Sequence, residues 1–263
     1  MRVLIDAGMG KQNIDSVKKS GVDVLILSHC HIDHRLTIRE IADVPVWCHK
    51  KEVPYLHDKA LFLSATGITR SGFDLMRLID SADGLFDVTI SRTLVDGEKI
   101  DLGGLTLVIL HTAGHSPGHL AFYIPEYELL FSADVDLTPF GPFYGHDFAE
   151  IDDFINSIDK LRNLEARIVA TGHAGPFEGH VSSYLTDYKE VIFHRERLVL
   201  ERLTQPRALE YFKGRNLVFR SYPDPSDLIQ WFELVHIEKH LRRLSNLGKV
   251  RQNDGLWMQS RIP

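Results

Sequence analysis

The chain alternates short apolar runs with segments of helical periodicity. Residues 22–27, 105–110 and 120–124 are apolar runs, each rich in β-branched or aromatic residues, of the length typical of buried strands. Residues 151–164 instead repeat apolar side chains at intervals of three and four, as an amphipathic helix does. Because strands and helices alternate, the pattern predicts a layered fold containing both.

The last third of the chain has a different pattern. Residues 181–203 and 227–247 show long helical spacing, and residues 250–258 contain the Asp254-Gly255 pair typical of a tight hairpin turn. We therefore predict two parts, a mixed domain over residues 1–180 and a helical region over residues 181–263. The apolar stripe on the first long helix needs a partner surface.

Metal-binding residue types crowd the end of the 22–27 strand. His29, His31, Asp33 and His34 fall within six residues. Alternate side chains of an extended chain share a face, so His29 and His31 can point the same way. Once the backbone turns, Asp33 and His34 can reach a second point. Imidazole and carboxylate suit zinc, with iron or manganese as alternatives, so this segment predicts half of a two-metal site.

Three more candidate ligands follow later strands. His115, Asp134 and His173 each stand just beyond an apolar run, in segments rich in small residues. A carboxylate such as Asp134 can bridge two cations, because each oxygen can serve one metal. Cys30 lies between two candidate ligands and should face away from them, as a packing residue.

Two segments leave their roles open. Residues 136–146 are rich in proline, glycine and aromatic residues and could wall a substrate pocket or form a loop packed by its own rings. Residues 73–79 include helix-compatible spacings and could form a flap beside the site, although ordinary core contacts are favoured.

Composition limits the partners. The formal net charge of −6 gives no global attraction for nucleic acid or an anionic membrane. With only two cysteines, no signal-like start and no apolar run long enough to span a bilayer, we expect a cytoplasmic protein without membrane contact. One local cluster is basic: Lys239, Arg242, Arg243, Lys249 and Arg251. Because Glu233 and Glu238 interrupt it, a solvated helix face or a homodimer contact is favoured over nucleic-acid binding.

Taken in order, the candidate segments resemble the metallo-β-lactamase superfamily. The resemblance covers residues 1–180 and includes Leu4-Ile5-Asp6-Ala7-Gly8 as the early strand motif. It implies an α+β fold, a four-layer αββα sandwich with the metals at one edge between the sheets. Superfamily members usually have one or two strands before this motif, so we expect the first sheet to be trimmed or an N-terminal part to be absent. The C-terminal region resembles the winged-helix-like tail of the β-lactamase-like protein 2 and glyoxalase II-like branch.

The same resemblance implies roles for individual side chains. It assigns the first metal to His29, His31 and His115, and the second metal to Asp33, His34 and His173, with Asp134 as the bridge. Asp6 would orient a ligand through a hydrogen bond. His119 would support its loop, and neither His111 nor His180 is assigned as a ligand.

We therefore expect a hydrolase with two divalent metal ions, zinc first. A metal-bridged water, oriented by Asp33, would attack a small ester, thioester or lactone. The alternatives are a nuclease that cleaves single-stranded nucleic acid and a mononuclear-iron persulfide dioxygenase.

Overall fold

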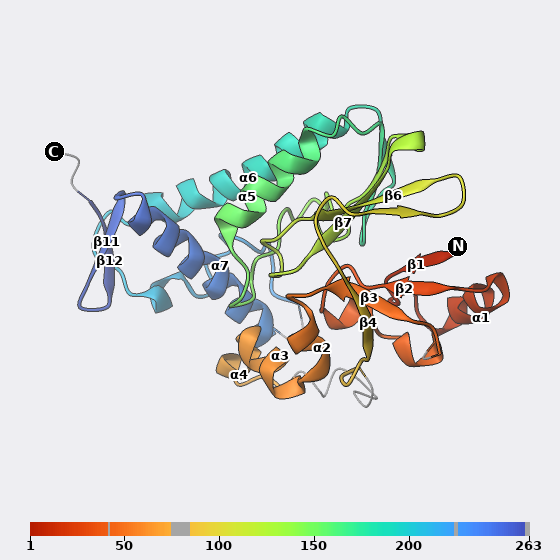
Figure 1. The fold of residues 1–263 in the computed structure, drawn as a ribbon. Helices are drawn as coiled ribbons and strands as arrows, with labels where there is room; N and C mark the ends of the chain where they lie inside the picture. The colour runs from red at the N-terminus through yellow and green to blue at the C-terminus, as the bar shows by residue number, and fades with distance from the viewer. Residues whose placement is uncertain (42, 75–84, 224–225, 261–263) are drawn as a thin grey trace.

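Two sheets packed face to face form the centre of the molecule. The computed structural model describes residues 1–41, 43–74, 85–223 and 226–260 (Figure 1). Among these residues the first sheet has four parallel strands in chain order: β1 (Val3–Ile5), β2 (Val24–Ile26), β3 (Val46–His49) and β4 (Ile90–Leu94). The predicted strand at residues 22–27 is therefore confirmed, and β1 lies at the edge of this sheet.

The second sheet is mostly antiparallel. Within the described chain its order is β10-β9-β8-β7-β6-β5. Only β8 and β9 pair in parallel, and helix α5 (Ile151–Arg162) lies in the long connection that such a pair requires. The strands are β5 (Lys99–Asp101), β6 (Thr106–His111), β7 (Leu120–Ile124), β8 (Leu129–Phe131), β9 (Ile168–Ala170) and β10 (Phe177–Glu178).

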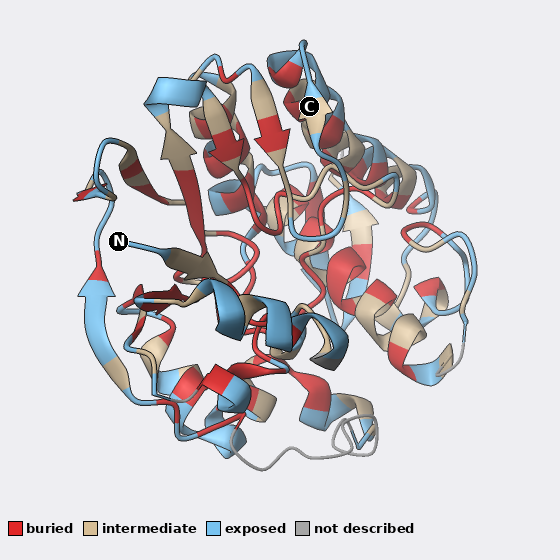
Figure 2. Ribbon diagram, turned by 90° about the vertical axis from the view of Figure 1, so that its right-hand side faces the viewer, coloured by how far each residue is buried: buried red, intermediate tan, exposed pale blue. Residues whose placement is uncertain are grey.

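Helices cover the outer face of each sheet. Helices α5 and α6 (Val181–Glu201) lie over the second sheet, while α1 (Lys11–Ser20), α2 (Val53–His57), α3 (Lys59–Ala65) and α4 (Ile68–Ser71) accompany the first (Figure 1). Between the sheets, Ile26, Ile109 and Phe122 belong to one buried apolar cluster. Figure 2 shows buried residues along the strands and exposed residues on the outer helix surfaces. The predicted αββα sandwich is confirmed.

The C-terminal region contains the expected helices and hairpin. The N-terminal half of α6 packs on α5 through Leu185 and Ile192, whereas Val199 near its end joins a separate cluster. That second cluster also contains residues of α7 (Ser226–Asn246) and of the hairpin formed by β11 (Val250–Asn253) and β12 (Leu256–Gln259). Helix α6 thus packs against both parts of the chain. The domain division at residue 180 and the winged-helix likeness stay predictions.

Three of the five basic residues in the cluster, Lys239, Arg242 and Arg243, have partners within the protein. Arg243 pairs with Glu196 and with Asp152, and Arg242 pairs with Glu238 on the next turn. Lys239 donates to the backbone carbonyls of residues 147 and 149.

We expected Glu233 to interrupt that cluster. It does not, because its side chain is fully buried. Its carboxylate accepts hydrogen bonds from the backbone N–H groups of Leu217 and Val218. A buried charge is costly unless it is hydrogen-bonded. These two N–H groups stabilise the carboxylate in the interior.

Short segments differ in detail from the sequence prediction. Two short segments that also have helical spacing, 37–41 and 206–212, form only single 3₁₀ turns, Ile38–Ile41 and Leu209–Phe212. Such short segments lack the length needed to sustain an α-helix by themselves. The flap proposed for residues 73–79 falls mostly outside the described residues. Across the parts that are described, no helix is both long and apolar enough to cross a membrane.

Candidate metal centre

The candidate ligands meet where strands of both sheets end. His29 and His31 follow β2, and Asp33 and His34 lie in the 3₁₀ turn Ile32–His34. From the other sheet, His115 follows β6, Asp134 follows β8 and His173 follows β9. Side chains separated by up to 144 positions are thereby brought to one edge of the sandwich.

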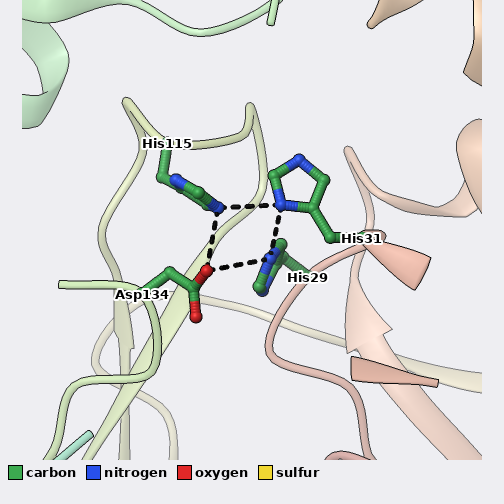
Figure 3. A group of neighbouring side chains, drawn as sticks. All are labelled: His29, His31, His115 and Asp134. Carbon is green, nitrogen blue, oxygen red and sulfur yellow. Dashed lines mark hydrogen bonds and ion pairs between the residues drawn. The ribbon is translucent and has the colours of Figure 1, made fainter. Parts of the chain in front are cut away.

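Four of these side chains form a first group. One ligand atom from each of His29, His31, His115 and Asp134 lies within 4.8 Å of the others, and all four residues are buried (Figure 3). Nδ1 of His31 lies 2.9 Å from Nε2 of His29 and 2.8 Å from Nε2 of His115. Oδ2 of Asp134 lies 3.2 Å from Nε2 of His115.

Asp33, His34 and His173 form a second group that meets the same limit. Oδ2 of Asp33 lies 3.7 Å from Nε2 of His34 and 3.5 Å from Nε2 of His173. Asp134 contacts this group as well, with Oδ1 3.0 Å from His34 and Oδ2 3.4 Å from His173. Its carboxylate therefore stands between the two groups.

The donor set fits divalent cations. Nε2 of His34 and Oδ1 of Asp134 are buried and have no hydrogen-bond partner in the described structure. Unsatisfied buried polar atoms are costly, and a cation would satisfy both. Ligands of a tetrahedral zinc ion lie about 3.4 Å apart, given metal–ligand distances of about 2.1 Å. The contacts of Asp134 with the four histidines, between 3.0 and 3.8 Å, bracket that spacing.

The buried histidines and Asp134 shift one another's pKa values. Burial and neighbouring imidazoles lower the pKa of His29 and of His31 well below the ordinary value, so both rings are held neutral. Burial would raise the pKa of Asp134, but the nearby histidines hold it well below its usual range. A neutral imidazole and an ionised carboxylate are the forms that bind metal.

Asp6 orients His34 as expected. Burial lowers the pKa of His34, but the charges of Asp6 and Asp134 outweigh it and raise that pKa well above the ordinary value. Oδ2 of Asp6 lies 2.8 Å from Nδ1 of His34 and also accepts from the Ser28 hydroxyl. This contact turns Nε2 of His34 toward Asp134.

The backbone approaches two of the candidate ligands, Asp33 and Asp134, closely. A Cβ added to Gly8 would lie 2.0 Å from the carbonyl oxygen of Asp33, and one added to Gly172 would lie 2.9 Å from Oδ1 of Asp134. Ala133, directly before Asp134, adopts a left-handed conformation with φ 45°. Such strain is typical of functional sites, where it aims one side chain.

Sequence reasoning missed His146. Its ring is buried, and Nδ1 lies 2.8 Å from Nε2 of His31. Burial lowers the pKa of His146 to about 3, so its imidazole is neutral. The only signal in the sequence was its place at the end of the aromatic 136–146 loop.

Glu52 was also missed. Its fully buried carboxylate accepts hydrogen bonds from the backbone N–H of Cys30, the hydroxyl of Ser116 and the backbone N–H of Gly118. It therefore joins the loop that carries His29 and His31 to the loop that carries His115. Nothing in the surrounding charged sequence distinguishes Glu52 from a surface residue.

Three further histidines from the sequence analysis, His111, His119 and His180, lie outside the two candidate ligand groups. His119 forms a hydrogen bond with the hydroxyl of Thr112 and accepts another from the backbone N–H of Asp134, so it supports its loop. His111 contacts the carbonyl of Pro117, and exposed His180 precedes helix α6. Neither His111 nor His180 belongs to a candidate metal group in the described chain. Cys30 is buried in the apolar cluster below the first sheet, so its packing role is confirmed.

The family model described as the metallo-beta-lactamase superfamily matches residues 2–173. The chain belongs to this superfamily. Its matched span contains every candidate ligand, from His29 to His173.

Curated relatives extend the superfamily match. The "Beta-lactamase-like protein 2 homolog" of Caenorhabditis elegans is 24% identical over 257 residues, which cover 95% of this chain and 76% of that protein. The "Acyl-coenzyme A thioesterase MBLAC2" of Gallus gallus is 25% identical over 189 residues, or 63% of this chain and 64% of that protein.

Solved structures of the superfamily share the fold. The metallo-beta-lactamase family protein TTHA1429 from Thermus thermophilus superposes with a TM-score of 0.78 at 21% identity, over 98% of this chain and 89% of that one. TTHA1623, solved in a di-iron-bound form, has a TM-score of 0.52 at 27% identity, over 67% of this chain and 82% of that one.

Proposed function

We propose that this protein is a dinuclear metal-dependent hydrolase that cleaves a small thioester or ester, with a lactone as a further substrate of the same chemistry. Membership of the superfamily and the His/Asp site support a metal-dependent hydrolase. The two-metal state, the ligand roles and the substrate class are our proposal.

One observation carries the two-metal proposal: Asp134 faces both groups of ligands. Its carboxylate lies 3.0 Å from His34 of one group and 3.2 Å from His115 of the other. A buried carboxylate between two sets of imidazoles suits a bridge between two cations. We propose His29, His31 and His115 for one ion, and Asp33, His34 and His173 for the other.

Two bound divalent ions would supply a nucleophile at neutral pH, because they would lower the pKa of water from its bulk value toward about 7, and they would stabilise developing negative charge. The chain's own groups hold and orient the reactants. The side chain of Asp33 is half-exposed and lines a cavity beside the candidate metal centre. We assign it the role of orienting the attacking water and accepting its proton. Asp6 holds the His34 ring in place through a hydrogen bond with Nδ1, on the ring edge that faces away from Asp134.

Zinc is our first choice for the metal, because the donors are mainly imidazole with carboxylate. Iron is the alternative that a relative favours, since TTHA1623 was solved in a di-iron-bound form. A thioester is supported by the chicken relative named as an acyl-coenzyme A thioesterase.

Metal analysis joined to a substrate panel tests this proposal. The protein, purified without added metal, should contain about two metal equivalents and hydrolyse a thioester, an ester or a lactone. His31→Ala or Asp134→Ala should lose metal and activity, while the control His180→Ala, at an exposed position outside the site, should keep both. Full activity in either site variant would overturn the proposal. So would activity confined to phosphodiesters, or oxygen consumption with a persulfide.

A further inference from the structure

A cavity opens directly beside the candidate metal centre. It has a volume of about 590 Å³, within the range of small-molecule sites. Its polar lining includes His31, Asp33, Asp134 and His173. Most of its other lining side chains are apolar and form what we call the apolar wall, among them Leu36, Phe62, Ile68, Phe143, Leu228 and Phe232.

The apolar wall is assembled from segments far apart in sequence. Phe62 and Ile68 come from α3 and α4, Phe143 comes from the 136–146 loop, and Phe232 comes from α7. The rings of Phe143 and Phe232 lie edge to face, with centroids 5.3 Å apart. In Figure 1 the end of α7 reaches α4, on the side of the molecule away from β1. The C-terminal region therefore contributes Leu228 and Phe232 to the lining of this cavity.

The apolar wall continues into the metal centre. The carbonyl of Phe143 lies 2.8 Å from Nδ1 of His115. The His146 ring, which contacts His31, packs against Phe143 at 5.2 Å and Phe232 at 5.4 Å between centroids. A group held by this wall would therefore lie next to the reacting centre.

No lysine or arginine is among the described residues that line the cavity. Basic residues near the lining are engaged elsewhere. Arg35 and Arg195 stack on the lining rings of Phe62 and Phe140 and donate to backbone carbonyls. Arg70 pairs with Asp147 and stacks over Trp231, and Lys239 donates to backbone carbonyls. A polyanion such as nucleic acid would find no cationic side chain here to hold its phosphates. The wall suits an uncharged hydrocarbon group.

Leu36 indicates where such a group would enter. It lines the cavity, follows the ligand-bearing turn and keeps 46% of its surface exposed. Covering it and the neighbouring rings with a hydrocarbon chain would remove apolar surface from water, which is favourable.

We propose that this cavity is the acyl-group site of the enzyme, and that its substrate is a thioester with an uncharged, apolar acyl chain. This inference rests on the proposed function. Water oxygen bonds to the carbonyl carbon and the carbon–sulfur bond breaks. The sulfur leaves as a thiolate, which takes up one proton of the water and becomes a thiol, and the other product is a carboxylic acid. Leu36 at the entrance and Phe232 on α7 determine acyl-chain preference.

A chain-length series tests the site. With acyl thioesters of N-acetylcysteamine from acetyl to octanoyl, kcat/KM should rise about fourfold per methylene until the cavity is filled, the fold-change equivalent to about 0.8 kcal/mol per buried CH₂. Leu36→Lys should lower the octanoyl-to-acetyl ratio about tenfold, since a charged head replaces apolar contact. Phe232→Ala should lower the same ratio. Leu61→Lys is the matched control, because Leu61 on α3 is 40% exposed and does not line the cavity.

A binding measurement separates this inference from the proposed function. S-alkyl thioether analogues of N-acetylcysteamine cannot be hydrolysed, and calorimetric titration of the metal-loaded protein should show affinity rising with alkyl length. Hydrolysis without chain-length dependence would overturn the acyl site and leave the hydrolase proposal standing. Length-dependent binding without hydrolysis would support the apolar site and overturn the hydrolase. An octanoyl-to-acetyl ratio equally low in Leu36→Lys and Leu61→Lys would also overturn the acyl site.

Discussion

Nδ1 of His146 lies 2.8 Å from Nε2 of His31, on the side of the ring that faces away from His29 and His115. A ligating nitrogen carries no proton. If Nδ1 of His31 binds the proposed metal, the proton would lie on Nε2, which would donate to His146. We expect this hydrogen bond to set the tautomer and the orientation of the His31 ring.

Replacing His146 should weaken metal binding without removing a proposed ligand. His146→Phe keeps the ring packing against Phe143 and Phe232 but loses the hydrogen bond, so metal affinity should fall about 10- to 100-fold. His146→Asn places an amide oxygen near the Nδ1 position and should retain more affinity. Competition with a chromophoric chelator measures both. Wild-type affinity in the phenylalanine variant would contradict the role.

Glu52→Gln should loosen the connection between the two ligand-bearing loops. The carboxylate accepts three hydrogen bonds, and an amide nitrogen in its place would face a donor. We expect a loss of about 2 kcal/mol in the free energy of unfolding, measured by urea denaturation, together with weaker metal binding. Glu201→Gln, at an exposed position at the end of α6, is the control and should change neither quantity.

Acid should remove a stabilising contribution from Glu196. Burial would raise the pKa of this carboxyl, but the nearby His240 and the ion pair with Arg243 outweigh burial and lower the pKa below the ordinary value. The folded state therefore favours the charged form. The contribution is complete above the unfolded-state pKa of about 4.3 and is lost as the pH falls through the lower folded-state value.

Urea denaturation of Glu196→Gln measures that contribution. The variant should be less stable than the wild type at pH 7, and the difference should shrink as the pH falls below 4. A difference that stays constant from pH 7 to pH 3 would show that the charge of Glu196 is not its source. Arg243 also pairs with Asp152, so the variant leaves this arginine one partner.

Deleting residues 181–263 should prevent stable folding. Leu185 and Ile192 of α6 are fully buried against a cluster that includes Phe154 and Ile158 of α5. The deletion would expose this apolar surface to water and also remove Leu228 and Phe232 from the cavity wall. Soluble yield and near-ultraviolet circular dichroism measure the result. A soluble, fully folded truncated protein would contradict it.

The pattern along the sequence predicted alternating strands and helices and placed the seven candidate ligands at strand ends, while the resemblance to the superfamily implied the sandwich. A buried strand needs a continuous apolar run, and a ligand at its end needs a particular residue type, so both leave local traces. His29, His31, Asp33 and His34 share one segment, and the later candidates each follow an apolar run. Helices α6 and α7 were visible for the same reason, since their periodicity is local.

Tertiary structure decided what depends on contacts between distant segments. His146 and Glu52 have no distinctive neighbours in sequence, and only folding brings them to His31 and to the 115–118 loop. The cavity wall likewise joins Leu36, Phe143 and Phe232, which no sequence period relates. Burial and hydrogen bonding of a side chain depend on what folds against it, so these roles could be recognised only once the segments were packed together.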